Sequence, residues 1–113
     1  MIKIYHNNRC SKSRCGLAFL ETSGKPFEVV KYLDDVPTVL ELKNILKLLN
    51  IKPINLVRKN EAIWKENFKN KDLNDSEIII AMVKYPKLIE RPIVINGNKA
   101  VIGRPPELIL NIL

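Results

Sequence analysis

The sequence is short of the residues that disulfide-rich and metal-binding proteins need. It has two cysteines, with four residues between them, and a single histidine. Two cysteines so close together do not make the disulfide framework of a small secreted protein, so we expect both thiols to be reduced. A zinc site built from His6, Cys10 and Cys15 would lack a fourth ligand, and we expect no metal site.

Long apolar runs are also missing. No run approaches the length of a membrane-spanning helix, and the N-terminus lacks the basic-then-apolar pattern of a signal peptide. These absences predict a cytoplasmic protein without a membrane partner. The chain has 113 residues, of which 46% are hydrophobic, and this is enough for one compact domain over residues 1–113.

Arginine is scarce in a chain that is otherwise basic. The net charge is +7, with fourteen lysines and five arginines. The lysines are spread along the chain without a basic run, and few aromatic residues could stack on bases, so nucleic acid is an unlikely partner. In so lysine-rich a chain, an arginine tends to occupy positions where its planar fork can contact an oxyanion through two hydrogen bonds. This reasoning selects Arg58, Arg91 and Arg104.

The segment from Tyr5 to Cys15 carries the clearest chemical signal. It follows residues 2–4, which alternate as a short strand does, and it precedes residues 17–20, which have the character of a helix. Cys10 is therefore expected at a helix N-terminus, where free N–H groups and the helix dipole favour the thiolate. Cys10 is the candidate nucleophile, and its basic neighbours are His6, Arg9, Lys12 and Arg14.

The two cysteines are expected to differ. A lone cysteine in a soluble chain is more often a small buried hydrophobe than a catalyst. Cys10 departs from that rule because its neighbours are polar and basic. Cys15 lies four residues before Phe19, on the predicted inward stripe of the helix, and we expect it to be packed. A Cys10–Cys15 disulfide would require the helix to unwind locally.

The first and middle parts of the chain predict a parallel unit followed by helices. Residues 27–32 resume the strand pattern after the first helix, which gives a β-α-β unit with parallel pairing. Thr38 and Glu41 have the spacing of a capping box that opens a helix to about residue 49. A second capping signal at residues 74–77 introduces a buried helix that ends near Tyr85. The helical insertion therefore covers about residues 38–85.

The last third predicts a hairpin and a closing helix. Residues 93–95 and 100–102 flank Asn96-Gly97, which is a strong signal for a tight turn between antiparallel strands. Arg104-Pro105-Pro106 then begins a helix, because proline is tolerated in its first turn. The expected fold class is α/β, with a central mixed four-stranded sheet made of a βαβ part and a ββα part.

This order is that of the thioredoxin fold, and four motifs resemble the glutaredoxin-linked arsenate reductase family, including its short uncharacterised relatives. The resemblance covers essentially the full length. The motifs are Tyr5-His6-Asn7 leading to Cys10-Ser11-Lys12-Ser13-Arg14, Leu56-Val57-Arg58-Lys59, Ile89-Glu90-Arg91-Pro92-Ile93-Val94, and Ile102-Gly103-Arg104-Pro105-Pro106-Glu107.

The resemblance implies a role for each site residue. The nucleophile is Cys10, and the oxyanion-binding arginines are Arg58, Arg91 and Arg104. His6 and Ser13 belong to the surroundings that stabilise the thiolate, and Pro92 is expected to be a cis-proline beside the cysteine.

The resemblance also implies the reaction. The Cys10 thiolate would attack arsenate, and the adduct would be reduced with glutathione and glutaredoxin as reductants, without a bound cofactor.

Three other functions would use the same residues. A cysteine-dependent phosphatase needs arginine six positions after the cysteine, and that position is Gly16, which argues against it. The Spx-like regulators that bind RNA polymerase share the fold, usually with a two-cysteine switch, but Ser13 stands in place of the second cysteine here. A thiol reductase for another substrate, such as a glutathione mixed disulfide, would use Cys10 equally well.

Overall fold

The computed structural model describes residues 2–113, which form two compact units. The first unit combines the chain up to Asp35 with the segment from Arg91 to Leu113, and the second runs from Val36 to Glu90. The helical insertion expected over about residues 38–85 falls within the second unit. None of the helices in residues 2–113 is both long and apolar enough to span a membrane.

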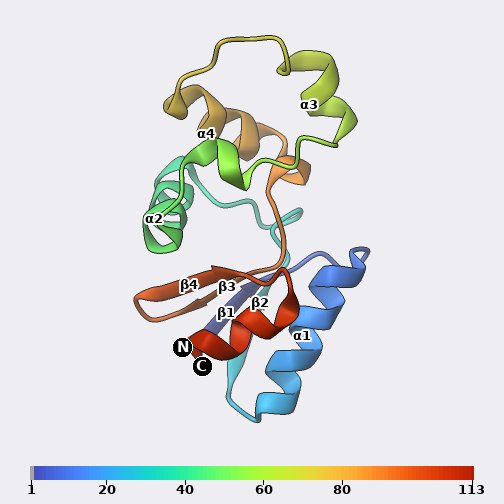
Figure 1. Ribbon diagram of the computed structural model, residues 1–113, viewed down its shortest axis with the longest axis vertical. Coiled ribbons are helices and arrows are strands. Elements are labelled where there is room, and N and C mark those ends of the chain that lie inside the picture. Colours follow the sequence, from blue (N-terminus) through green and yellow to red (C-terminus); the bar gives the residue numbers. More distant parts are fainter. Residues whose placement is uncertain (1) are drawn as a thin grey trace. The chain divides into compact units, whose positions relative to one another are not determined.

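The first unit contains the whole sheet (Figure 1). Its strands are β1 (Ile2–Tyr5), β2 (Phe27–Val30), β3 (Ile93–Asn96) and β4 (Lys99–Ile102), in the order β2-β1-β3-β4. β1 pairs in parallel with β2, while β1–β3 and β3–β4 are antiparallel, so the mixed sheet and the βαβ and ββα parts are confirmed.

Two helical elements of the first unit pack together and support the sheet. α1 (Ser11–Ser23) follows β1, and η3 (Pro106–Ile112), a 3₁₀ helix, closes the chain. Their contact with the sheet buries one apolar cluster, because the alternating side chains of β1 and β3 face α1 and η3. The buried members of this cluster are Ile2, Ile4, Leu20, Val94 and Ile109.

The predicted hairpin is present, but its turn lies one residue later than the Asn96-Gly97 pair, because Asn96 is the last residue of β3. Gly97 has a φ of 63°, in the left-handed region that an L side chain rarely adopts, and it joins β3 to β4. The ladder pairs Asn96 with Lys99 next to the turn and Ile93 with Ile102 at its far end. The residues that precede β3 and those that follow β4 are therefore neighbours.

The second unit is built of helices. Its longer helices are α2 (Val39–Leu49) and α4 (Asp75–Lys84), and each begins with the predicted capping box. α4 contains three consecutive isoleucines at residues 78–80. This run forms a helix although isoleucine is typical of strands. The shorter elements are η1 (Pro53–Leu56), α3 (Ala62–Asn67) and η2 (Pro86–Leu88).

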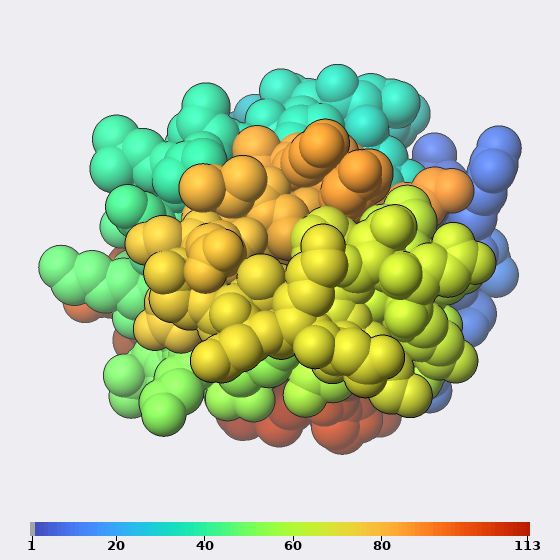
Figure 2. Space-filling view, turned by 90° about the horizontal axis from the view of Figure 1, so that it is seen from above, coloured from blue at the N-terminus to red at the C-terminus, as the bar shows by residue number. Residues whose placement is uncertain are grey.

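Aromatic side chains tie α3 to the end of α4. The ring of Phe68 stacks on Trp64 with centroids 5.6 Å apart and meets the ring of Tyr85 edge-on at 6.0 Å. Figure 2 shows this end of the second unit, with α3 and the segment that follows it in yellow-green and yellow. Phe68 is the C-cap residue of α3, so this contact lies at the end of the helix.

Candidate active site

One end of the sheet gathers the segments that carry the candidate site residues. Tyr5, the last residue of β1, lies opposite Val30 of β2 and Ile93 of β3. The loop to Cys10 therefore leaves the sheet where β3 begins and β4 ends. The entry to β3 and the exit from β4 carry Arg91-Pro92 and Gly103-Arg104, so the strand register alone brings two of the three selected arginines to the Cys10 loop.

Cys10 is the N-cap residue of α1, as predicted. Its backbone is extended, with φ −95° and ψ 120°, and its carbonyl accepts the first helical hydrogen bond, from Arg14 at 3.0 Å. The Cys10 N–H donates a 3.1 Å hydrogen bond to the Asn7 carbonyl, which closes the turn that precedes the helix. The thiol is partly exposed and free, so it is open to a substrate.

The local groups favour the Cys10 thiolate. Burial raises the pKa of Cys10, but hydrogen bonds from the backbone of Ser13 and Lys12, together with the hydrogen bond and charge of Arg91, outweigh burial and leave the pKa below its ordinary value. The sequence predicted this effect from the helix N-terminus. The structure adds Arg91 as one nearby cation that contributes.

Arg104 contacts the sulfur and is itself held in place. Its Nη2 lies 3.6 Å from Cys10 Sγ, and its Nε donates a 2.7 Å hydrogen bond to the carbonyl oxygen of Arg91. One guanidinium thus uses its planar fork to bridge the backbone at the start of β3 and the reactive thiol. Two cations beside a thiolate are a suitable environment for a small oxyanion.

Close backbone approach makes this arrangement possible. The Arg91–Pro92 peptide bond is cis, as the resemblance implied, and the Arg104–Pro105 bond is cis as well. The Gly103 N–H donates to the Pro92 carbonyl at 2.9 Å. A Cβ on Gly16 would lie 2.8 Å from Pro92 Cγ, so only glycine allows α1 to pack this closely beside the proline.

His6 and Ser13 form a buried pair under the Cys10 loop. His6 Nδ1 lies 2.7 Å from Ser13 Oγ, which also accepts the Asn7 N–H at 3.0 Å. Burial lowers the pKa of His6, and the positive charges of Lys31 and Arg14 lower it further, against the opposing hydrogen bonds with Asn8 and Ser13. His6 is therefore neutral at neutral pH and supports the loop through hydrogen bonding rather than charge.

Loss of the Ser13 hydroxyl is expected to destabilise the fold. Ser13→Ala removes the partner of both the buried His6 ring and the Asn7 N–H, so the free energy of unfolding should fall by about 1–3 kcal/mol. Urea unfolding followed by circular dichroism measures the change. Ser11→Ala, at an exposed position of the same helical turn, is the matched control and should change stability by less than about 0.5 kcal/mol. Equal effects of the two variants would contradict this account.

Alkylation of Cys10 is expected to follow a shifted pH profile. In a Cys15→Ser background, the rate of reaction with iodoacetamide should rise with pH and level off at a lower pH than for the same chain unfolded in urea, because only the thiolate reacts. Since the pKa is depressed in the folded state, the thiolate stabilises the fold above the unfolded pKa, and this contribution is lost as the pH falls through the folded pKa. A midpoint at or above that of the unfolded chain would contradict the assignment.

Arg58 belongs to the second unit. Its Nη1 forms a 2.9 Å ion pair with Glu90 Oε1, and both side chains are about one-quarter exposed. The main chain around them is fixed by an isolated bridge between Val57 and Ile89. The part of Arg58 in binding an oxyanion stays a prediction.

Cys15 corrects one expectation. It was predicted to be packed, but it is exposed, and both cysteines are free. The buried positions of α1 are Ser13, Gly16 and Leu20, so the inward stripe lies on the opposite side of the helix from Cys15. Cys15 instead borders an open apolar groove with Phe19 and Leu110.

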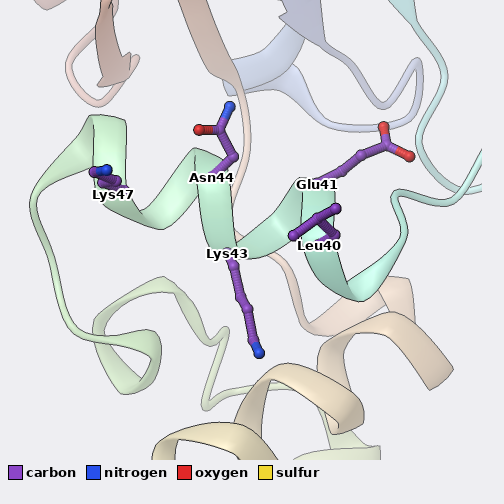
Figure 3. A pocket seen from close by; sticks show the side chains of 5 residues that line it. All are labelled: Leu40, Glu41, Lys43, Asn44 and Lys47. Atoms are coloured by element: carbon purple, nitrogen blue, oxygen red, sulfur yellow. The ribbon is translucent and has the colours of Figure 1, made fainter.

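One hollow of the second unit lacks this chemistry. A surface hollow along α2 is lined by Leu40, Glu41, Lys43, Asn44 and Lys47. Figure 3 shows that these side chains spread in different directions, with Lys43 and Asn44 on opposite sides of the helix. Within residues 2–113, no three histidine, cysteine or acidic side chains gather in a way that could hold a metal ion.

Known proteins are similar to this chain in sequence and in fold. The profile of the ArsC family matches residues 5–112. The chain is 46% identical to the Escherichia coli protein YfgD, named as uncharacterised, over 99% of this chain and 96% of YfgD. It is also 46% identical to a Haemophilus influenzae protein named arsenate reductase, over 97% of each chain.

A solved structure agrees with these relatives. The structure titled arsenate reductase from Vibrio cholerae matches with a TM-score of 0.94 and 45% identity, over 99% of this chain and 97% of that one. The similarity to these proteins therefore extends over the sheet, the Cys10 loop and both units. This chain belongs to the ArsC family.

Proposed function

We propose that this protein is an arsenate reductase that works through the Cys10 thiolate and uses glutathione and glutaredoxin as reductants. The proposal depends on one observation: a thiol of lowered pKa, Cys10, interacts with two arginines. These are Arg91 and Arg104, and Nη2 of Arg104 lies 3.6 Å from the sulfur. Relatives named arsenate reductase at 43–46% identity support the same substrate. Arsenate is an anion with phosphate-like charge, and its approach to a thiolate requires cations that offset the repulsion.

The first step forms the adduct. The Cys10 sulfur attacks arsenic, a sulfur–arsenic bond forms, and one arsenate oxygen leaves as water after taking up protons. Arg91 and Arg104, which interact with Cys10, hold the remaining oxygens in this proposal and stabilise the charge that builds up on them.

The second step transfers two electrons. The glutathione sulfur attacks the Cys10 sulfur, a disulfide forms, and the electron pair of the sulfur–arsenic bond stays on arsenic. Arsenic passes from the +5 to the +3 state and leaves as arsenous acid with its three oxygens. Glutaredoxin then removes the glutathione from Cys10, which restores the thiol. One cysteine is sufficient for this cycle.

Direct measurement of arsenite tests the proposal. The wild-type protein is incubated with arsenate, glutathione and glutaredoxin, and arsenite is separated by chromatography and quantified over time. Catalytic arsenite formation that stops when glutaredoxin is omitted is the expected result. If the protein forms no arsenite above the rate without enzyme, although Cys10 still reacts as a low-pKa thiol, the substrate assignment is wrong.

A further inference from the structure

The helix that carries Cys10 begins without the cap that α2 and α4 possess. These two helices start at Thr38 and Asn74, whose side chains each accept the N–H of the residue three positions later. Cys10, the N-cap residue of α1, forms no such side-chain hydrogen bond, and the first turn of α1 contains no acidic residue. A thiol that must stay free to react cannot also cap its helix. The position of Cys10 therefore depends on contacts outside α1.

Asn7, in the loop before α1, forms three hydrogen bonds around this position. Its side-chain Oδ1 accepts the Arg9 N–H at 3.0 Å, and its carbonyl oxygen accepts the Cys10 N–H at 3.1 Å. Its own N–H donates to Ser13 Oγ, inside α1, at 3.0 Å. The first of these bonds forms an Asx turn, in which the amide side chain takes the place of a backbone acceptor. One residue thus links the loop both to Cys10 and to the first turn of α1.

The Asx turn holds the backbone directly before the nucleophile. Arg9 is exposed and adjoins Cys10, so without Asn7 its N–H would be left to water. On the other side of the nucleophile, the Cys10 carbonyl accepts the Arg14 N–H at 3.0 Å. The backbone is therefore held on both sides of Cys10, while the thiol itself stays free.

We propose that Asn7 is a positioning residue that holds the Cys10 thiol at the N-terminus of α1 in place of a side-chain cap. Arg104 Nη2 lies 3.6 Å from Cys10 Sγ, and such a contact weakens steeply when its geometry is disturbed. A displacement of about 1 Å at a reacting group is enough to lower a rate markedly. The effect on Cys10 is independent of the substrate, while the effect on arsenate turnover rests on the proposed function.

Asn7→Ala tests this role, because it removes the side-chain acceptor and leaves the backbone groups of Asn7 in the chain. In the Cys15→Ser background, the pH midpoint for alkylation of Cys10 should rise, and the rate at pH 7 should fall about 3-fold, because less thiolate is present. The kcat/KM for arsenate should fall about 10-fold, because the sulfur is less often aligned for attack. A merely structural role would lower the stability and leave the midpoint of the folded protein unchanged, and that result would overturn the proposal.

Two further variants serve as rescue and control. A serine hydroxyl can accept the same N–H two residues further on, so Asn7→Ser should recover at least about half of the lost alkylation rate. Asn98 is an exposed asparagine in the turn between β3 and β4, at the opposite end of the sheet from the Cys10 loop. Asn98→Ala should change neither the midpoint nor kcat/KM. Equal losses in Asn7→Ser and Asn7→Ala, or an equal loss in Asn98→Ala, would contradict the proposal.

Hydrogen exchange of the wild-type protein tests the Asx turn if Asn7→Ala does not fold. The Arg9 N–H, followed by NMR, should exchange at least about 10-fold more slowly than in the unfolded chain, because Asn7 Oδ1 accepts it. Exchange at the unfolded rate would overturn the proposal. Should the wild type reduce no arsenate, only the proposed substrate fails, because neither alkylation nor hydrogen exchange involves it.

Discussion

Replacing Cys10 by serine is expected to lower arsenate-dependent turnover by at least about 10³-fold, because a serine hydroxyl is a much weaker nucleophile than a thiolate and cannot form the disulfide of the second step. The measurement is arsenate-dependent oxidation of NADPH, coupled through glutathione reductase, glutathione and glutaredoxin. The loss should appear in kcat, since the variant removes the reacting atom.

Cys15→Ser is the matched control for this prediction. Cys15 is exposed on the side of α1 opposite its buried stripe, so its removal should preserve turnover to within about 2-fold. The reverse pattern, with activity lost in Cys15→Ser and retained in Cys10→Ser, would refute the assignment of the nucleophile. Loss of activity in both variants would indicate a two-cysteine mechanism instead.

Arg104→Lys is expected to lower kcat/KM for arsenate about 100-fold. A lysine has one donor group at its tip and cannot reproduce the fork that spans the Arg91 carbonyl and the Cys10 sulfur. The same coupled assay measures the change, and urea unfolding checks that the variant remains folded.

Arg9→Lys is the control for this charge-conserving change. Arg9 adjoins Cys10 but is exposed, so the substitution should leave kcat/KM unchanged within about 2-fold. Unchanged kinetics in Arg104→Lys would remove that residue from the site. Arg58→Lys, assayed in the same way, tests the predicted third oxyanion ligand: a large fall in kcat/KM would support it, and wild-type kinetics would exclude it.

The features that could be predicted from sequence are those with local causes. The capping boxes at Thr38 and Asn74 and the turn at Gly97 depend on residues a few positions apart, and all three are present. Cys10 was placed at the start of a helix from the same kind of signal, and it is the N-cap of α1. Short-range sequence patterns determine where helices and turns begin and end, so these boundaries can be predicted without knowledge of the tertiary structure.

The error at Cys15 has a physical cause. The buried stripe of α1 is formed by Ser13 and Gly16 as well as Leu20, and hydrophobic periodicity misses polar and small residues that are buried for other reasons. Ser13 is buried because its hydroxyl forms hydrogen bonds with the His6 ring and the Asn7 N–H. Gly16 is buried because Pro92 packs directly against it. The apparent stripe of Cys15 and Phe19 faces an open groove instead.

The hydrogen bond between Arg104 and the Arg91 carbonyl was beyond the reach of local sequence patterns for a different reason. It depends on the register of β3 with β4, which brings the start of β3 beside the end of β4. A shift of register by one residue would move every side chain to the other face of the sheet. Contacts of this kind depend on long-range pairing, which no local motif specifies.

The most direct test of the central claim is mass spectrometry of the protein after one turnover. Wild-type protein is mixed with arsenate and glutathione, without glutaredoxin, and arsenite and the modified cysteine are quantified together. The account predicts one glutathione on Cys10 for each arsenite released, and neither product when arsenate is omitted. Arsenite without a modified Cys10, or glutathione on Cys15 alone, would contradict it.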